Sequence, residues 1–125
     1  MMNRWKRGDE FSGEVQHCCD GDTIVVAWDE SGVAAHLPDR VRLALIQAPE
    51  FFPFVQPGAM VARGRLEDLA VWKSCVCRVA RSSLDKYGRL IAHVSVGGLD
   101  VGMALLGEGL VTLWRPRVQR AVRQR

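Results

Sequence analysis

The sequence predicts a mainly β (α+β) fold, in which a five-stranded barrel carries two to three helices. Five short runs rich in β-branched and aromatic residues are separated by turn residues such as Gly, Pro, Asp and Ser. One helical pattern lies between the third and fourth runs, and another follows the fifth. The chain has 125 residues, enough for one hydrophobic core but not for two. Five short strands with these connections favour a partly open Greek-key barrel of the OB type.

The first three strands are expected within the first 47 residues. Residues 11–18 alternate loosely between apolar and polar, and Thr23–Trp28 is β-branched and aromatic. A long third strand is predicted over 33–47, with a bend at Pro38 and Asp39. Its apolar side chains fall on both faces, with Val41, Leu43 and Leu45 on one and Ala44 and Ile46 on the other. Such a strand is covered on both sides, as in a barrel wall with a helix packed outside it.

The spacing predicts a helix over 57–72, which begins at Pro57 after the proline-rich segment 48–53. The buried stripe of this helix is expected to contain Met60 or Val61, Leu66, Leu69 and Trp72. Strands over 74–81 and 89–96 follow, joined by a turn over 82–88. A short helix is predicted over 101–108, with Asp100 as its N-cap and Gly109 as its stop.

Charge and composition divide the chain into an N-terminal extension (1–10), a folded domain (11–114) and an Arg-rich C-terminal tail or short helix (115–125). The net charge is +3, yet the last eleven residues contain five arginines and no acid. Such a tail suits contact with a polyanion, and equally suits a solvated chain end. No apolar run approaches the ~20 residues that span a membrane, and no signal peptide is visible. A cytoplasmic location is expected, or a secreted or periplasmic one if a leader has been removed.

The four cysteines are predicted to be buried free thiols. None shows the C-x2-C spacing of a structural zinc site, and adjacent Cys18 and Cys19 point to opposite faces of a strand. Cys75 and Cys77 share one face of a strand and behave as small core residues.

Three stretches place charged residues at the edges of apolar runs. The first is Asp20-Gly21-Asp22-Thr23, which suits either a tight turn or a ligand for a hard cation. The second runs from Arg42 to Glu50. Arg42 lies among apolar neighbours and needs a partner, either an acid such as Asp22 or a phosphate. The third is the segment 85–89, Asp-Lys-Tyr-Gly-Arg. Together they could hold a metal ion and a phosphate at the same time.

The order and spacing of these stretches resemble the staphylococcal nuclease family. The matching motifs are CDGDTI (19–24), VRL (41–43) with IQAPE (46–50), DKYGR (85–89) and LLGEGL (105–110), and the resemblance spans about 11–114. It implies that Arg42 and Arg89 bind the phosphate and that Glu50 orients or deprotonates the attacking water. It also implies that Asp22 binds the metal and that Lys86 and Tyr87 contact the nucleotide. Tyr87 could instead be an ordinary half-buried turn residue.

Position 47 departs from the family pattern. The family usually has an aspartate there as a second metal ligand, whereas Gln47 offers only a neutral amide oxygen. Ala48 replaces a threonine, but its backbone carbonyl could still bind the metal. One anionic ligand fewer should weaken the Ca²⁺ site and could favour Mg²⁺ or Mn²⁺.

The sequence therefore predicts a metal-dependent endonuclease that hydrolyses phosphodiester bonds of DNA or RNA with little sequence specificity. Its partner would be nucleic acid and not a membrane, whereas any protein partner stays open. The alternative is a nucleic-acid-binding module on the same barrel that has weak or no catalytic activity. A protein-interaction scaffold is a third possibility, although a scaffold would not need Arg42, Glu50 and Arg89.

Overall fold

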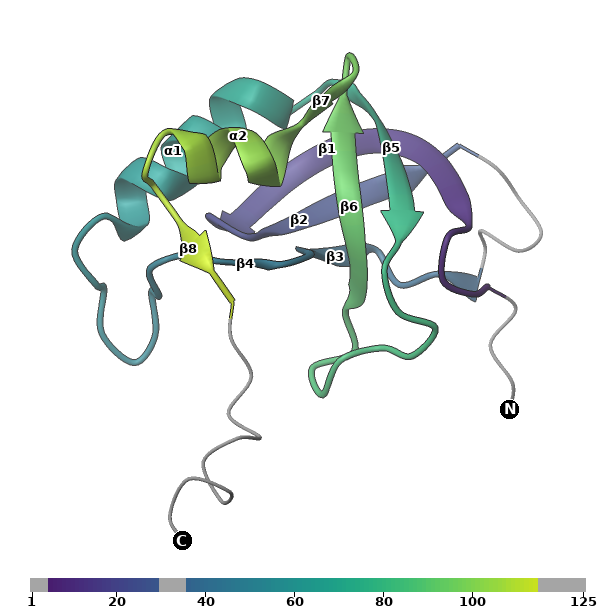
Figure 1. Cartoon of the computed structure of the whole chain (residues 1–125), viewed down its shortest axis with the longest axis horizontal. Coiled ribbons are helices and arrows are strands. Elements are labelled where there is room, and N and C mark those ends of the chain that lie inside the picture. The colour runs from purple at the N-terminus through teal and green to yellow at the C-terminus, as the bar shows by residue number, and fades with distance from the viewer. Residues whose placement is uncertain (1–4, 30–35, 115–125) are drawn as a thin grey trace, which may run out of the picture.

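The computed structural model describes residues 5–29 and 36–114 and shows a closed five-stranded barrel with two helices packed against it (Figure 1). This confirms the predicted fold class. The barrel strands are β1 (Glu10–Asp20), β2 (Thr23–Trp28), β3 (Arg40–Leu43), β5 (Ser74–Val79) and β6 (Leu90–Val96). The helices are α1 (Ala59–Ala70) and α2 (Val101–Gly107). The predicted tail over 115–125, the first four residues of the extension and part of the expected third strand lie outside the described residues.

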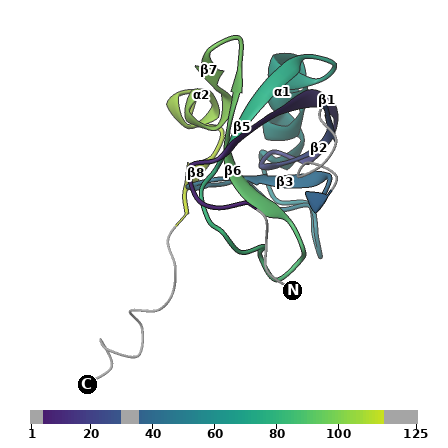
Figure 2. The ribbon, with the colours of Figure 1, turned by 90° about the vertical axis from the view of Figure 1, so that its right-hand side faces the viewer.

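The sheet follows the order β3-β2-β1-β5-β6 and closes through a parallel pairing of β3 with β6. All its other pairings are antiparallel. Figure 2 shows the ribbon turned by 90° from the view of Figure 1. A two-residue strand, β7 (Leu99–Asp100), pairs with the end of β6. A separate ladder joins β4 (Ile46–Gln47) to β8 (Thr112–Leu113). The parallel closure matters for function because it places Arg42 opposite Ile91, two residues beyond Arg89.

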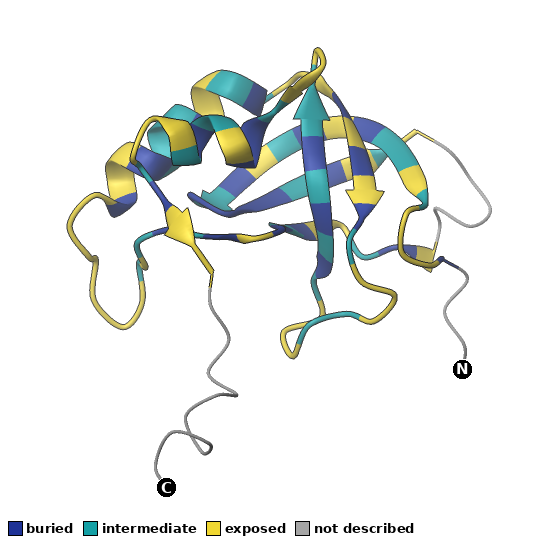
Figure 3. Ribbon diagram, viewed as in Figure 1, coloured by how far each residue is buried: buried dark blue, intermediate teal, exposed yellow. Residues whose placement is uncertain are grey.

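The core fills the barrel and the space beneath the helices (Figure 3). Alternate strand residues point inward, which is the two-residue period expected of a half-covered sheet. The largest fully buried side chains include Ile24, Leu43, Ile46, Leu66, Leu90 and Leu105. Trp5 also belongs to this core, so the chain contributes to the fold before β1 begins at Glu10.

The prediction of one long third strand over 33–47 is wrong. Regular pairing in β3 covers only Arg40–Leu43, and a turn at Ala44 and Leu45 separates it from β4. Leu45 has φ of 71°, a left-handed conformation that side chains rarely adopt, and is exposed instead of lying on the core face with Leu43. The turn is tied by Arg42, whose guanidinium donates to the carbonyls of Leu43 and Ile46 at 2.9 and 2.7 Å.

The predicted buried face of the first helix is also wrong in part. The helix runs from Ala59 to Ala70 instead of over 57–72, and Met60 and Val61 are exposed on it. Its buried residues are Ala59, Ala62, Leu66 and Ala70. Small residues on this face let the helix approach β1 closely, and that packing decides the orientation more than the large side chains do. Trp72 follows the helix with φ of 65° and is exposed.

Several local predictions are confirmed. The carboxylate of Asp100 accepts the backbone N–H of Met103 at 2.9 Å as the N-cap of α2, and Gly109 adopts φ of 75° after its end. All four cysteines are free; Cys18, Cys75 and Cys77 are buried, and Cys19 is half-buried.

No helix in the described parts of the chain has the length and apolarity to cross a membrane.

Candidate functional site

One cavity of about 990 Å³ gathers every residue that the sequence singled out for chemistry. It lies where the β1–β2 turn, the β3–β4 segment, the loop after β4 and the turn before β6 come together. The last two of these segments project from the same side of the barrel (Figure 1). The predicted site residues in its wall are Asp22, Arg42, Gln47, Ala48, Glu50, Lys86, Tyr87 and Arg89.

Gly21 holds the β1–β2 turn close to helix α1. A Cβ atom at this position would lie 2.8 Å from the Cβ of Ala62 and 2.9 Å from the Cβ of Ala48. Only glycine fits, so the residue between the two acids serves close packing more than backbone flexibility. The result is that Asp22 is pressed against the segment that carries Gln47 and Ala48.

Asp22 is a buried carboxylate, with only 4% of the residue exposed. It accepts the backbone N–H of Ala48 at 2.8 Å and the hydroxyl of Thr23 at 3.1 Å, and it lies 3.6 Å from the guanidinium of Arg42. Burial raises the pKa of Asp22 to about 6, helped by its neighbour Asp20, because Arg42 and the Ala48 N–H only partly offset the lost hydration. A negative charge here is costly unless another cation comes to it.

Arg42 projects from β3 into the cavity. Besides the two carbonyls of the β3–β4 turn, its guanidinium donates to the side-chain oxygen of Gln47 at 3.1 Å. Three of the five N–H donors of the guanidinium are thus used among the described residues, and two more are available in principle for a phosphate. From the sequence alone, the partner of Arg42 could be either an acid or a phosphate. The structure shows Asp22 nearby, together with backbone carbonyls that fix the direction of the side chain.

Arg89 is fixed from two sides just before β6. Its Nε donates to the carboxylate of Asp85 at 2.7 Å, and a terminal nitrogen donates to the hydroxyl of Thr23 at 3.0 Å. Burial alone would raise the pKa of Asp85, but the N–H donors of Arg89 and Tyr87 lower it below its ordinary range. Thr23 also pairs with Arg42 across β2 and β3, so one residue links both arginines.

Glu50 follows Pro49 at the end of β4 and is exposed to the cavity. Its backbone is tied by Gln56, which bonds it twice. The N–H of Glu50 donates to the side-chain oxygen of Gln56, and the N–H of Gln56 donates to the carbonyl of Glu50, both at 2.8 Å. This reciprocal pair closes the loop between them and fixes where the glutamate leaves the barrel.

Tyr87 stands between two cations at the far wall. The ammonium of Lys86 lies 5.2 Å from the centre of its ring, and the guanidinium of Arg89 lies 5.1 Å from it. The carbonyl of Tyr87 accepts a bond from Arg40 at 2.9 Å. The turn therefore carries an exposed ring that is flanked by positive charges, and its backbone is anchored to β3 through Arg40.

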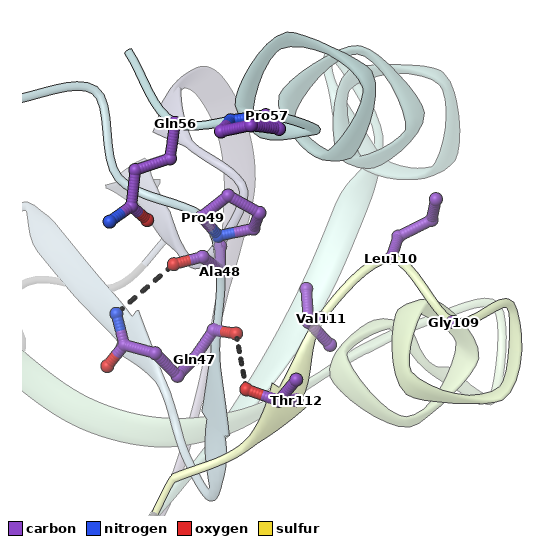
Figure 4. Close-up of a pocket in the computed structure, with 9 residues that line it drawn as sticks. All are labelled: Gln47, Ala48, Pro49, Gln56, Pro57, Gly109, Leu110, Val111 and Thr112. Carbon is purple, nitrogen blue, oxygen red and sulfur yellow. Dashed lines mark hydrogen bonds between the residues drawn. The ribbon is translucent and has the colours of Figure 1, made fainter. Parts of the chain in front are cut away.

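The expected metal ligands converge, but their oxygens already have protein donors. The side-chain amide of Gln47 donates to the carbonyl of Ala48 at 3.2 Å, and its oxygen accepts from Arg42. Figure 4 shows this amide beside a second hollow, of about 420 Å³, between the loop after β4 and residues 109–112. The backbone carbonyl of Gln47 accepts the hydroxyl of Thr112 at 3.4 Å, which joins β4 to β8.

The three oxygens suit a hard divalent cation in kind, since Ca²⁺ and Mg²⁺ take carboxylate, amide and carbonyl oxygens. They supply one negative charge in place of two. Within residues 5–29 and 36–114, no group of three or more His, Cys, Asp or Glu side chains could hold a metal ion. By donor type, these residues fit a hard divalent cation.

Four residues that support the site were absent from the set predicted from sequence. Asp85 and Thr23 orient Arg89, Gln56 anchors Glu50, and Arg40 anchors Tyr87. Asp85 and Thr23 lie inside recognised motifs, so their roles could have been suspected. Gln56 and Arg40 act through contacts that follow from the path of the loops and carry no pattern of their own.

Comparison with known proteins identifies one family. Its model, described as staphylococcal nuclease homologue, matches residues 40–124, which is more than half of the chain. The match includes the segments of Arg42, Glu50 and Arg89 but begins after Asp20–Thr23. A comparison with curated proteins found no match.

Proposed function

The chain belongs to the family of staphylococcal nuclease homologues, and on this premise we propose that it is a metal-dependent endonuclease. It would hydrolyse phosphodiester bonds of DNA or RNA with little sequence specificity. The observation that carries the proposal is the convergence of Arg42, Arg89 and Glu50 in one cavity, with both guanidinium groups and the backbone of Glu50 held by hydrogen bonds.

The two arginines would bind the phosphate. A guanidinium presents paired N–H donors that match the oxygens of a phosphate, and fixed donors stabilise the charge that develops in the transition state. Arg42 is held by backbone carbonyls and Arg89 by Asp85 and Thr23, so neither needs to reorganise during the reaction. Lys86 and Tyr87 would contact the rest of the nucleotide from the turn before β6.

Glu50 would orient or deprotonate the water that attacks the phosphorus. Glu50 is exposed at the cavity, and the hydrogen bonds of its backbone to Gln56 fix the point from which its side chain extends. The burial of Asp22 makes that second acid unsuited to the same task, because it lies behind Arg42 and is bonded to Ala48.

A divalent cation, Ca²⁺ or alternatively Mg²⁺ or Mn²⁺, would be held by Asp22, the side-chain oxygen of Gln47 and the backbone carbonyl of Ala48. When bound, it would add positive charge beside the phosphate. To bind it, Asp22 must be ionised, and the Ala48 carbonyl must use the lone pair that the Gln47 amide leaves free. Metal binding should therefore release a proton below about pH 6, and calorimetry in two buffers of different ionisation enthalpy would detect it.

The direct test is degradation of single-stranded DNA and of RNA by the purified protein, with Ca²⁺, Mg²⁺, Mn²⁺ or EDTA. We expect cleavage with at least one cation and none with EDTA. Absence of cleavage with all three cations would contradict the proposal.

A second candidate function is a nucleic-acid-binding module that does not cut. The observation that favours it is the side chain of Gln47, which bonds both the Ala48 carbonyl and Arg42 and thereby occupies two groups of the proposed site. This candidate predicts salt-sensitive binding of nucleic acid without turnover.

A further inference from the structure

The loop after β4 and the start of helix α1 expose five large apolar side chains within a stretch of ten residues. Phe52 and Phe54 are 83% and 80% exposed, while Val55, Met60 and Val61 are each between 59% and 64% exposed. Figure 3 shows this stretch exposed from the loop to the beginning of the helix. Single exposed apolar residues need no explanation, but a group of them marks contact with a protein or a membrane.

Most of this surface lies outside the candidate site. Phe52 lines the cavity that holds the arginines, but the other four residues line neither that cavity nor the smaller hollow of about 420 Å³. The core does not need them either, because α1 packs on the barrel through small residues and Leu66. We define the apolar patch as these four residues: Phe54, Val55, Met60 and Val61.

The loop that carries the patch is braced by contacts of its own. The reciprocal hydrogen bonds of Gln56 and Glu50 close it, and the backbone N–H of Ala59 donates to the carbonyl of Gln56 at 3.1 Å where the helix begins. The ring of Phe51 lies under the guanidinium of Arg63 at 4.8 Å, which joins the loop to α1. The patch is therefore presented on a fixed segment while its side chains stay exposed.

The charge around the patch is positive. Residues 51–66 contain two arginines and no acid. Arg65 is paired with Glu108 at 2.9 Å, whereas Arg63 has no ion-pair partner in the part of the chain that the structure describes. The cavity next to Phe52 is lined by five cations and four acids, and the last eleven residues of the sequence add five arginines. A partner for the patch should therefore combine apolar groups with negative charge.

The surface of a bilayer that contains anionic phospholipids meets both requirements, with an apolar interior for the patch and negative headgroups for Arg63. A second copy of the chain is a poorer match, because a two-fold contact would bring two acid-free segments with their arginines together. A nucleic-acid strand is also a poorer match, since valine and methionine offer no ring on which a base could stack. The sequence argued against a membrane because no apolar run could span one, but a protein that lies on the surface needs no spanning segment.

We propose that the apolar patch inserts into the surface of a bilayer that contains anionic phospholipids, with Arg63 at the level of the headgroups. The proposal goes beyond the proposed function and does not depend on it. Because Phe52 lines the cavity two residues before the patch begins, the candidate site would lie close to the lipid surface.

The experiment measures co-sedimentation of the full chain with vesicles of phosphatidylcholine alone and of phosphatidylcholine mixed with anionic phosphatidylglycerol. The test variants are Phe54→Ser and Met60→Ser, and Phe54→Leu is the rescue. Trp72→Ser is the matched control, because Trp72 is 67% exposed but lies beyond the other end of α1. Thermal unfolding checks that each variant is folded, which is expected because these side chains are exposed.

The wild type should bind the mixed vesicles. Phe54→Ser and Met60→Ser should each lower the partition coefficient about tenfold or more, the factor that burial of one such side chain contributes. Phe54→Leu and Trp72→Ser should bind like the wild type, since insertion needs an apolar side chain at position 54 and not a ring. Arg63→Gln should lower binding to the mixed vesicles about fivefold and leave binding to the neutral ones unchanged.

Four results would overturn the proposal. The wild type could fail to bind either kind of vesicle, or Trp72→Ser could lose as much binding as Phe54→Ser. A dimer in solution that Phe54→Ser converts to a monomer would assign the patch to a second copy of the chain. Weaker binding of single-stranded DNA by both serine variants would assign it to nucleic acid. A wild type that binds vesicles but no nucleic acid would contradict only the proposed function and would support the lipid patch.

Discussion

Replacing Asp22 with asparagine should make the protein more stable at neutral pH, although the residue lies at the centre of the candidate site. The carboxylate is 4% exposed, and its pKa is raised to about 6 because burial outweighs the attraction of Arg42. An acid whose pKa is raised on folding stabilises the native state fully below its unfolded pKa, here 3.8. That contribution is lost as the pH rises through about 6.

The shift from 3.8 to about 6 corresponds to about 3 kcal/mol of unfolding free energy. Asparagine carries no charge and resembles the protonated acid, so it escapes this loss. The asparagine side chain has one acceptor oxygen, whereas Asp22 uses both of its oxygens to accept hydrogen bonds from Ala48 and Thr23. The hydrogen bond that is lost costs about 1 kcal/mol. The net gain of Asp22→Asn at pH 8 should be about 2 kcal/mol.

Urea unfolding at several pH values between 4 and 8 measures this difference directly. The stability of Asp22→Asn relative to wild type should rise between pH 4 and pH 6 and then stay constant, while the exposed Asp29→Asn control follows the wild type. A relative stability that stays flat, or that falls over this window, would refute the assignment of a costly buried charge to Asp22.

Three further changes probe the same site. Asp85→Asn should lower the free energy of unfolding by about 1.5–3 kcal/mol at pH 7, because the 2.7 Å hydrogen bond to Arg89 loses its charge. This loss of stability should shrink as the pH falls through the lowered pKa of Asp85. Urea unfolding that shows no loss at pH 7 would contradict this prediction. Gln47→Asp should raise Ca²⁺ affinity about tenfold, because it adds a second carboxylate. The gain would be measured as a larger Ca²⁺-induced rise in Tm. A rise in Tm equal to that of the wild type would speak against this ligand set. Gly21→Ala should cost about 1–3 kcal/mol in thermal unfolding, because its Cβ would lie 2.8 Å from that of Ala62, and a neutral result would disprove the close packing.

Local signals in the sequence predicted the elements that depend on neighbouring residues. Asp100 caps α2 and Gly109 ends it, because caps and left-handed stops act within one turn. The break between β3 and β4 could not be predicted in this way. It depends on Leu45 in a left-handed conformation, on the bonds of Arg42 to its own turn and on pairing with β8 more than sixty residues later.

The site shows the same division. The motifs predicted which side chains line the cavity, because charged residues beside apolar runs seldom have a purely structural role. The contacts that fix them arise between distant segments, such as Thr23 with Arg89, and leave no periodic pattern. The buried face of helix α1 was predicted only in part: Leu66 is buried as expected, but the close approach of Ala62 to Gly21 leaves room for no more than a small residue there, and Met60 and Val61 are exposed.

The role of the cavity in hydrolysis can be tested by comparing cleavage and binding of one single-stranded DNA by the wild type and Glu50→Gln. Glu67→Gln, an exposed change on α1, serves as the control. Glu50→Gln should lose cleavage but still bind the strand, because Arg42 and Arg89 are untouched, while the control should cleave normally. Undiminished cleavage by Glu50→Gln would contradict the role of this cavity in hydrolysis.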